Sequence, residues 1–269
     1  MMNVFRWQDA PIADFAVIGD PIAHSLSPKM HNAAFASLGL EYKYVAIRVP
    51  AGRAGMALER LSHLGYKGVN VTVPHKEEAL EWLNESDPLA RRIRACNTIR
   101  PADRSGTNTD APGFLETIEA FNFAPGQSAL ILGAGGSARA IAAALEQAQL
   151  RISIYNRTLE NASRLITSLG LNASLMESPT VEGFDLIVNT TSASLEGAEM
   201  HIDWAKAKPT AVAYDLTYMA VTTPFLEPAV KAGLRTTDGK ALLVAQGARS
   251  FEWWLGREAP REVMKKAIA

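Results

Sequence analysis

The sequence predicts an α/β fold with two domains and mostly parallel strands. Short apolar runs alternate with helix-forming stretches along almost the whole chain, which is typical of βαβ units. A glycine-rich turn at 133–138 (Gly-Ala-Gly-Gly-Ser-Ala) lies in the middle of the chain. About 110 residues with the same alternation precede this turn, which is enough for a separate domain. The 269 residues, 48% of them hydrophobic, are sufficient for two buried cores.

The first half of the chain is expected to form a mostly parallel α/β domain. Its strand candidates are runs of apolar and β-branched residues, and its helix candidates follow turn or capping residues. The expected strands lie near 15–18, 42–49, 69–73 and 97–100, and the expected helices near 29–38, 53–64, 76–83 and 112–120. We assign residues 1–110 to this domain and expect the C-terminal helices in 239–269 to pack back on it.

The glycine-rich turn carries the features of a dinucleotide-binding βαβ unit. It follows the apolar run 129–132 and leads into an alanine-rich stretch, as a strand, a tight turn and a helix start would. Gly133 allows the sharp turn, Gly135 lets the backbone approach a pyrophosphate, and Ala138 lets the helix pack on the strand. The helix N–H groups would then bind the phosphates. The alternative is a glycine turn that binds nothing.

Residues 111–238 are therefore expected to form a Rossmann-like, doubly wound domain. The remaining expected strands lie near 152–155, 186–189 and 212–215, and two helices near 241–255 and 260–268 close the chain. The strand at 152–155 is followed by Asn156-Arg157-Thr158, where an NAD-specific protein usually has an acidic residue. An arginine there suits a ribose 2′-phosphate, which predicts NADP as cofactor and hence redox chemistry.

Composition excludes several other classes of protein. The chain has 27 basic and 28 acidic residues and a formal net charge of −1, which argues against a nucleic-acid or anionic-membrane partner. The single cysteine, Cys96, is expected to be a buried apolar residue in a reducing compartment. No apolar run is long enough to span a membrane, and the first residues do not resemble a secretory signal. We therefore expect a cytoplasmic protein.

Polar residues gather at three turns or strand ends of the first half. Ser25 and Ser27 precede a helix start at Pro28 and could hold a small anion such as a carboxylate; alternatively Ser27 is the N-cap of that helix. In the second segment, alternation places Asn70 and Thr72 on one face of a strand.

Lys76 follows that strand, at the start of a helix. The helix dipole disfavours positive charge there and so favours proton transfer near neutral pH; the alternative is a solvated surface lysine. In the third segment, Asp110 either caps the helix that follows it or faces Lys76 and orients the ammonium.

Together these segments resemble the shikimate dehydrogenase family over nearly the whole chain. The resemblance rests on several motifs in the family's order: GDPIAHSLSPKMHN (19–32), NVTVPHK (70–76), ACNTI (95–99), GTNTD (106–110), GAGGSARA (133–140), NRT (156–158), DLTY (215–218) and LVAQGARSF (243–251).

The resemblance implies a role for each matching position. Lys76 and Asp110 match the catalytic pair, and Ser25 and Ser27 match the residues that hold the substrate carboxylate. The other substrate-binding positions are Asn70, Thr72, Asn97, Tyr218 and Gln246. The positions implied for the cofactor are Gly133, Ala134, Gly135, Gly136, Ser137, Asn156, Arg157, Thr158, Thr190, Gly239 and Leu242.

Three departures from the family pattern stand out. Asp110 is followed by Ala-Pro-Gly instead of Gly-x-Gly, and the segment 238–243 (Asp-Gly-Lys-Ala-Leu-Leu) replaces a Gly-x-Gly-Met-Leu pattern. Asn161 replaces a second basic residue near the 2′-phosphate, which predicts a weaker NADP preference.

The function implied by the resemblance is reversible reduction of 3-dehydroshikimate to shikimate by NADPH, in a cleft between the two domains. Alternatives are a quinate or aminoshikimate dehydrogenase, or an NADP-binding sensor without catalysis. No metal is expected, since the five histidines lack ligand spacing. A monomer or a homodimer is expected.

Overall fold

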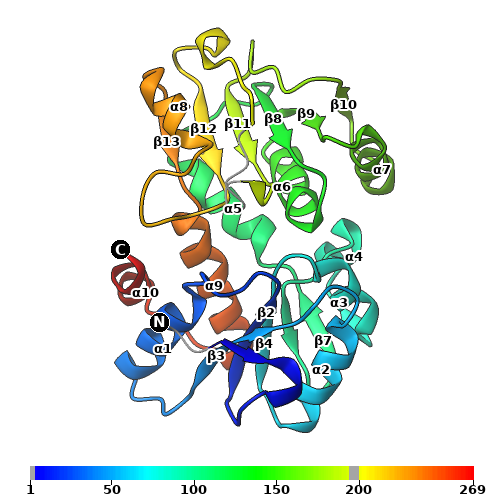
Figure 1. Cartoon of the computed structure of the whole chain (residues 1–269), viewed down its shortest axis with the longest axis vertical. Helices are drawn as coiled ribbons and strands as arrows, with labels where there is room; N and C mark the ends of the chain where they lie inside the picture. The colour runs from blue at the N-terminus through cyan, green and yellow to red at the C-terminus, as the bar shows by residue number, and fades with distance from the viewer. Residues whose placement is uncertain (1–3, 194–199) are drawn as a thin grey trace. The chain divides into compact units, whose positions relative to one another are not determined.

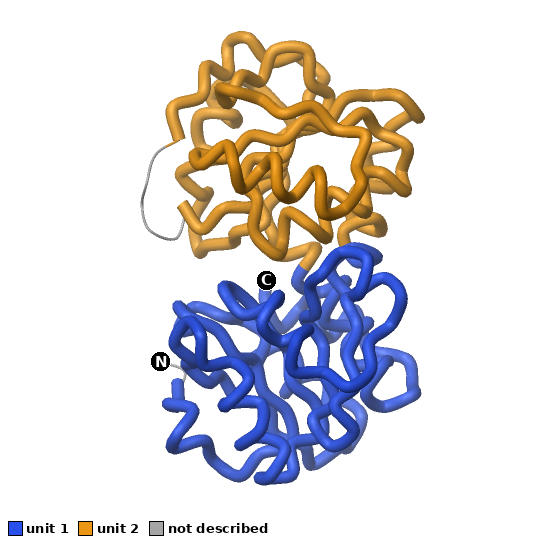
Figure 2. Tube along the Cα trace, turned by 90° about the vertical axis from the view of Figure 1, so that its right-hand side faces the viewer, with its two compact units in different colours: residues 1–113, 243–269 blue, residues 114–242 orange. Residues whose placement is uncertain are grey.

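The computed structural model describes residues 4–193 and 200–269, and the chain divides into two compact units. Unit 1 comprises residues 1–113 and 243–269, and unit 2 comprises residues 114–242 (Figure 2). Two helices pass from one unit to the other: α5 (Asp110–Glu119) and α9 (Lys240–Leu255). Unit 1 is therefore built from two separate segments of the chain.

Unit 1 contains a seven-stranded sheet in the order β1-β3-β2-β4-β6-β7-β5. Its strands are β1 (Val4–Arg6), β2 (Phe15–Gly19), β3 (Tyr44–Arg48), β4 (Gly68–Val71), β5 (Glu85–Ser86), β6 (Thr98–Arg100) and β7 (Ser105–Thr107). Strands β1 to β4 are mutually parallel, as expected, whereas β6 runs antiparallel to both β4 and β7.

Helices cover both faces of this sheet. Besides α9, they are α1 (Ser27–Ser37), α2 (Ala54–His63), α3 (Lys76–Trp82), α4 (Pro88–Ile93) and α10 (Arg261–Ile268), together with the 3-10 turn η1 (Trp7–Asp9). Helices α2 and α3 bury Leu58, Leu61 and Ala79 against one face (Figure 1). On the opposite face the rings of Phe15 and Trp254 lie 5.0 Å apart, which brings α9 onto β2.

The contact between α9 and the sheet depends on a glycine. A Cβ on Gly68 would lie 2.5 Å from the Trp254 indole, so only glycine lets the ring pack directly on β4. The indole Nε1 donates to the carbonyl of Ile99, 3.0 Å away in β6. Helix α10 packs against α1. The C-terminal helices are therefore part of unit 1.

Unit 2 contains a fully parallel six-stranded sheet in the order β10-β9-β8-β11-β12-β13. Counted along the unit, this is the order 3-2-1-4-5-6 of a Rossmann domain, which confirms the predicted fold class. The strands are β8 (Ser128–Leu132), β9 (Arg151–Tyr155), β10 (Ala173–Met176), β11 (Leu186–Asn189), β12 (Val212–Asp215) and β13 (Arg235–Thr237). The strand order reverses between β8 and β11, at the glycine turn.

Helices cover both faces of this sheet. Because consecutive residues of a strand point to opposite faces, neighbouring residues of β12 contact different helices. Ala213 packs in a cluster with α8, whereas the next residue, Tyr214, packs against Phe114 of α5 at 5.1 Å between ring centroids. The remaining elements are α6 (Gly136–Gln147), α7 (Leu159–Leu169), α8 (Leu226–Lys231) and the 3-10 turn η3 (Trp204–Lys206).

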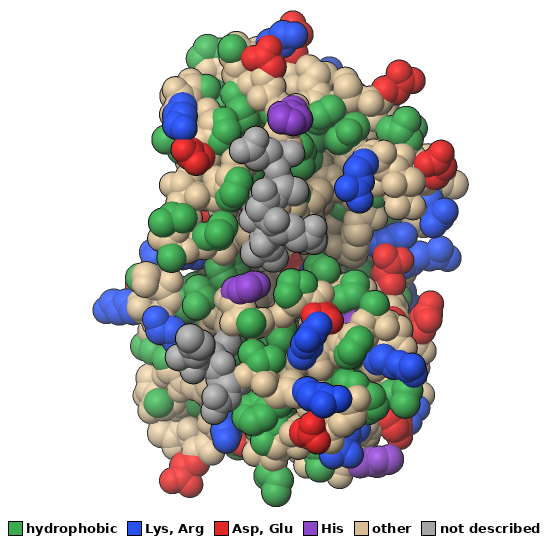
Figure 3. All heavy atoms as spheres, in the orientation of Figure 1, with side chains coloured by type: hydrophobic (Ala, Val, Ile, Leu, Met, Phe, Trp, Pro, Cys, Tyr) green, Lys and Arg blue, Asp and Glu red, His purple; other side chains and the backbone are tan. Residues whose placement is uncertain are grey.

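The surface agrees with the balanced composition. Acidic and basic side chains are interspersed on the face shown in Figure 3. Within residues 4–193 and 200–269, none of the helices combines the length and the apolar character needed to cross a membrane.

A histidine is fully buried in unit 1. His31 of α1 stacks on Tyr44 with ring centroids 4.5 Å apart and an interplanar angle of 1°. Neither of its ring nitrogens has a hydrogen-bond partner within the described residues. Burial lowers the pKa of His31 from 6.5 to about 3. The folded protein therefore keeps this ring neutral in mildly acidic solution.

This burial predicts a loss of stability in acid. The unfolded chain takes up a proton at His31 below about pH 6.5, whereas the folded chain does so only near pH 3. The free energy of unfolding therefore falls as pH decreases through that window, by up to about 1.4 kcal/mol per pH unit from this residue. We expect His31→Phe, which keeps an aromatic ring there, to show a shallower dependence in urea titrations between pH 7 and pH 5. Equal pH slopes for both proteins would contradict this account.

Candidate active site

Lys76 and Asp110 form a buried ion pair in unit 1. The Lys76 Nζ lies 2.8 Å from the Asp110 Oδ2, and the two residues are only 7% and 8% exposed. Lys76 is the first residue of α3 and Asp110 is the first residue of α5. The interpretation of Lys76 as a solvated surface lysine is therefore wrong, and the expected meeting of the two side chains is confirmed.

The expectation that Asp110 caps the following helix is also wrong. Helix α5 begins at Asp110 itself, and the capping oxygen comes from a residue that the sequence analysis did not consider. The side-chain Oδ1 of Asn108 accepts the backbone N–H groups of Asp110 (3.0 Å) and Ala111 (3.2 Å). Because Asn108 satisfies these donors, the Asp110 carboxylate remains available to Lys76.

Asn97 joins the two segments of unit 1 beside this pair. Its Oδ1 accepts the backbone N–H of Thr109 at 2.8 Å, which fixes the orientation of the amide. Its Nδ2 then donates to the Thr109 Oγ1 at 3.0 Å and to the Gln246 Oε1 at 3.4 Å. Thr109 directly precedes Asp110. Asn97 and Gln246 are thus held close to the ion pair, although 149 residues separate them in the sequence.

Asn70 and Thr72 occupy different environments. The Asn70 amide is buried: its Oδ1 accepts from the Tyr44 hydroxyl at 2.7 Å, and its Nδ2 donates to the carbonyl oxygen of Asn97 at 3.1 Å. Thr72 follows β4 and is half-buried. A Cβ on Gly19 would lie 2.5 Å from the Thr72 Cγ2, so glycine allows Thr72 to pack on the end of β2. Direct contact of Asn70 with a small molecule stays a prediction.

Ser25 and Ser27 lie at the start of α1. The helix begins at Ser27, so the interpretation of Ser27 as its N-cap is wrong; instead the Ser25 Oγ accepts the backbone N–H of Ser27 at 3.3 Å. Ser27 is buried and Ser25 is half-buried. Ser25 also lines a pocket with the basic side chains of Lys29 and Lys43. These neighbours favour an anion near Ser25.

The glycine turn of unit 2 has room for a ligand. Gly133 has φ +115°, and a Cβ there would lie 2.4 Å from the Thr190 Oγ1. Gly135, in contrast, has no atom within 4 Å of the position of a Cβ. Helix α6 begins at Gly136, and its N-cap residue, Gly135, has no side chain with which to cap it. Open space beside the N-terminus of a helix fits a pyrophosphate.

The Asn156–Thr158 loop adjoins this turn. The backbone N–H of Gly133 donates to the carbonyl of Tyr155 at 2.8 Å, which joins the turn to the end of β9. The Asn156 Nδ2 donates to the Thr158 carbonyl at 2.8 Å and so closes the loop before α7. Arg157 is exposed. Its guanidinium is thus accessible to a phosphate at the end of β9.

The other expected cofactor residues of unit 2 lie near the ends of its strands. The Thr190 hydroxyl donates to the carbonyl of Leu132 at 2.8 Å. A Cβ on Gly239 would lie 2.0 Å from the carbonyl oxygen of Leu216, so only glycine permits this approach. Leu242 is buried. Tyr218, which was expected to bind the substrate and not the cofactor, is half-buried.

Asp215, the first residue of the DLTY motif (215–218), has a structural role that the motif alone does not reveal. Its buried carboxylate accepts from the Asn189 Nδ2 (3.0 Å), the backbone N–H of Thr217 (3.0 Å) and the Thr223 hydroxyl (2.7 Å). It therefore orders the loop that carries Tyr218.

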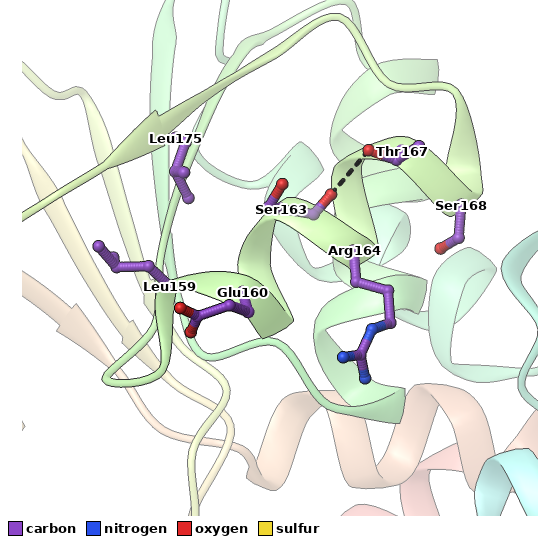
Figure 4. Close-up of a pocket in the computed structure, with 7 residues that line it drawn as sticks. All are labelled: Leu159, Glu160, Ser163, Arg164, Thr167, Ser168 and Leu175. Atoms are coloured by element: carbon purple, nitrogen blue, oxygen red, sulfur yellow. Dashed lines mark hydrogen bonds between the residues drawn. The ribbon is translucent and has the colours of Figure 1, made fainter.

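A separate pocket in unit 2 contains none of the expected site residues. It lies between α7 and β10 (Figure 4), where the Thr167 Oγ1 donates to the carbonyl of Ser163 at 3.0 Å. The lining residues are Leu159, Glu160, Ser163, Arg164, Thr167, Ser168 and Leu175.

Cys96 is buried, as expected, and burial raises the pKa of its thiol to about 12. Among the described residues, no group of three or more histidine, cysteine, aspartate or glutamate side chains could hold a metal ion.

Comparison with known proteins gives consistent matches along the chain. Three family descriptions match: "Shikimate dehydrogenase substrate binding domain" at residues 17–99, "Shikimate / quinate 5-dehydrogenase" at 118–210 and "Shikimate 5'-dehydrogenase C-terminal domain" at 242–269. The shikimate dehydrogenase (NADP(+)) of Moorella thermoacetica is 43% identical, over 94% of this chain and 91% of that protein.

Solved structures agree. Shikimate 5-dehydrogenase from Thermus thermophilus, in complex with NADP(H) and shikimate, matches with a TM-score of 0.84 and 37% identity, over 98% of both chains. The shikimate dehydrogenase of Aquifex aeolicus matches with a TM-score of 0.87 and 33% identity, over 94% of this chain and 96% of that one.

The two glycines of the turn form a matched pair for mutation. We expect Gly133→Ala to destabilise the protein by about 1–3 kcal/mol, because alanine is strained at this φ and its Cβ clashes with Thr190. Gly135→Ala should change stability by less than about 0.5 kcal/mol, because the site is open. Urea unfolding of both variants measures the difference. Equal losses for the two would mean that the geometry of the turn is not what restricts position 133.

Proposed function

The chain belongs to the shikimate dehydrogenase family, and on that basis we propose that it catalyses the reversible reduction of 3-dehydroshikimate to shikimate by NADPH. It is thus an NADP-dependent oxidoreductase of aromatic amino-acid biosynthesis. The observation that carries the proposal within this structure is the buried Lys76–Asp110 pair next to Asn97 and Gln246. It combines a proton donor with hydrogen-bonding groups suited to a polyhydroxylated ring.

Lys76 is the proposed general acid and base. In the direction of reduction, the Nζ of Lys76 donates a proton to the oxygen of the C3 carbonyl; in oxidation it accepts the proton from the hydroxyl. Asp110 holds the ammonium in place through the 2.8 Å contact. Bound NADPH supplies the hydride that the carbonyl carbon receives. Proton transfer of this kind typically contributes about 10²–10⁴-fold in rate.

Other residues of unit 1 would fix the position of the substrate. We assign its carboxylate to Ser25 and Ser27, a role supported by the nearby Lys29 and Lys43. The ring hydroxyls are assigned to Asn70, Thr72, Asn97 and Gln246. Contact of Tyr218, a residue of unit 2, with the substrate stays a prediction. Holding both ends of the ring aligns the carbonyl for reaction.

The cofactor is assigned to unit 2. The open turn at Gly135 and the N-terminus of α6 fit the pyrophosphate, with Ala134, Gly136 and Ser137 beside it. Arg157, supported by Asn156 and Thr158, would bind the 2′-phosphate. The nicotinamide is assigned to Thr190, Gly239 and Leu242. In this proposal residues 111–238 form the NADP-binding domain, and 1–110 with the C-terminal helices form the substrate-binding domain.

Quinate is the second candidate substrate. The family description that matches residues 118–210 names both shikimate and quinate. The Lys76–Asp110 geometry weighs against a sensor without catalysis, because that function needs no buried proton donor. Aminoshikimate as substrate, the cytoplasmic location and a monomeric or homodimeric state stay predictions.

A direct assay tests the proposal. The purified protein is mixed with shikimate or quinate and with NADP⁺ or NAD⁺, and formation of the reduced nicotinamide is followed by absorbance. We expect the highest kcat/KM for shikimate with NADP⁺. Faster turnover of quinate would make quinate the substrate in place of shikimate. Tight NADPH binding without turnover of either acid would favour an NADP-binding sensor without catalysis.

Removal of the Lys76 amine should abolish most turnover. We expect Lys76→Ala to lower kcat about 10²–10⁴-fold, since the general acid is lost. Lys208→Ala is a matched control, because it breaks an ion pair of the same 2.8 Å length, with Asp185 in unit 2. Steady-state kinetics of both variants give the comparison. If the Lys76→Ala protein keeps most of its kcat, Lys76 is not the general acid and base.

Removal of the Arg157 guanidinium should reduce the preference for NADP. We expect Arg157→Ala to lower kcat/KM with NADPH about 10–100-fold and to leave NADH little affected, because a charged hydrogen bond to phosphate is lost. Arg164→Ala, which removes another exposed arginine of unit 2, is the control (Figure 4). An unchanged ratio of NADPH to NADH activity would refute the assignment.

A further inference from the structure

Ser250 of α9 is a buried polar residue to which neither the motifs nor the mechanism gives a role. Its side chain is 0% exposed. The Oγ lies 2.7 Å from the Thr98 Oγ1, 3.0 Å from the Asn70 Nδ2, 3.2 Å from the Thr109 Oγ1 and 3.0 Å from the Gln246 carbonyl oxygen. One hydroxyl thus contacts residues of β4, β6, the loop before α5, and α9.

Donor and acceptor chemistry fixes most of these bonds. A hydroxyl has one hydrogen to donate and can accept two. The Gln246 carbonyl can only accept and the Asn70 Nδ2 can only donate, so Ser250 donates to Gln246 and accepts from Asn70. Its second acceptor position is open to one of the two threonine hydroxyls, Thr98 or Thr109. Ser250 is therefore saturated by partners within the protein.

The hydrogen bonds of Ser250 lead to the proposed substrate-binding groups. Asn70 also donates to the backbone carbonyl of Asn97, and Thr98 is the next residue in the chain. The Asn97 amide is bonded to Thr109 and to the side chain of Gln246. Gln246 and Ser250 are four residues apart and so lie on one face of α9.

We propose that Ser250 is a positioning residue that holds the Asn97 and Gln246 amides in the orientation needed to bind the ring hydroxyls of the substrate. The proposal rests on the proposed function, because it assumes that these two amides contact the substrate. Ser250 itself is 0% exposed and its hydrogen-bonding capacity is met within the protein, so the proposal assigns it no direct contact with substrate or cofactor. Its effect is therefore on binding of the hydroxy acid and not on the cofactor or the proton transfer.

Ser250→Ala tests this role. Loss of the buried hydroxyl removes one hydrogen bond from Asn70 and one from Thr98, whose other partners belong to the same network as the Asn97 amide, so the amides are held less firmly. We expect KM for shikimate to rise about 5- to 20-fold, whereas KM for NADP⁺ and kcat change less than about 2-fold, as for loss of uniform substrate binding. A merely structural role would lower thermal stability or the active fraction and leave KM for shikimate unchanged.

Two further variants sharpen the result. Ser62→Ala is the control, since it removes a half-buried hydroxyl of the same unit that donates to the carbonyl of Pro101 at 3.0 Å. Thr98→Val removes the nearest partner of Ser250 with little change in volume. We expect Thr98→Val also to raise KM for shikimate. In the double variant with Ser250→Ala, the increase in KM should be smaller than the two single effects combined, because the two hydroxyls act through one network.

The outcomes separate this inference from the proposed function. Absence of shikimate turnover in the unmodified protein contradicts the proposed function and with it the basis of this inference. If the unmodified protein turns over shikimate and Ser250→Ala has an unchanged KM for shikimate, the positioning role of Ser250 is overturned and the proposed function is not affected. If Ser250→Ala does not fold, an unchanged KM for shikimate in Thr98→Val overturns it.

Discussion

A positive and a negative charge that leave water on folding have to face each other, since an unpaired buried charge costs several kcal/mol. Lys76 and Asp110 satisfy this requirement although they are 34 residues apart. Each is the first residue of a helix, so the pair forms only where the starts of α3 and α5 come together. The sheet brings about this meeting: β4, β6 and β7 are neighbours, and β6 runs antiparallel between the other two. The order of strands at this side of the sheet therefore allows the ion pair to form.

Amides and hydroxyls hold the segments around this pair in place. Asn108 satisfies the backbone at the start of α5, and Asn97 binds both the backbone and the hydroxyl of Thr109. Amides are suited to this task because each offers a donor and an acceptor at fixed angles. The same groups are the ones a hydroxylated ring needs. The same set of amide and hydroxyl groups therefore supports the fold and is available to bind the proposed substrate.

Local sequence patterns were sufficient to predict the main strands and helices, and they drew attention to Lys76 and Asp110, whose side chains meet in the structure. Strand β8, the glycine turn and the start of α6 follow from apolar runs and from the conformational freedom of glycine, both of which are local. Strands β1, β5 and β7 have two or three residues each, too few for a periodic signal. The capping role of Asn108 was not predicted, because Asp110 and Pro112 offered an equally good local explanation. The contacts of Ser250 depend on the return of α9 to the first sheet, and no local pattern contains that information.

The return of α9 and α10 to unit 1 also affects the order in which the protein can fold during its synthesis. Residues 114–242 emerge from the ribosome as an uninterrupted stretch, so unit 2 can complete its core while translation continues. Unit 1 begins first but lacks Trp254, Phe251 and the Ser250 hydroxyl until α9 has been made. Until then, one face of its central strands has no helix α9 to cover it. The part of the protein that is translated first is therefore the part that finishes folding last, and the nascent chain has to keep an apolar sheet face from aggregating in the meantime.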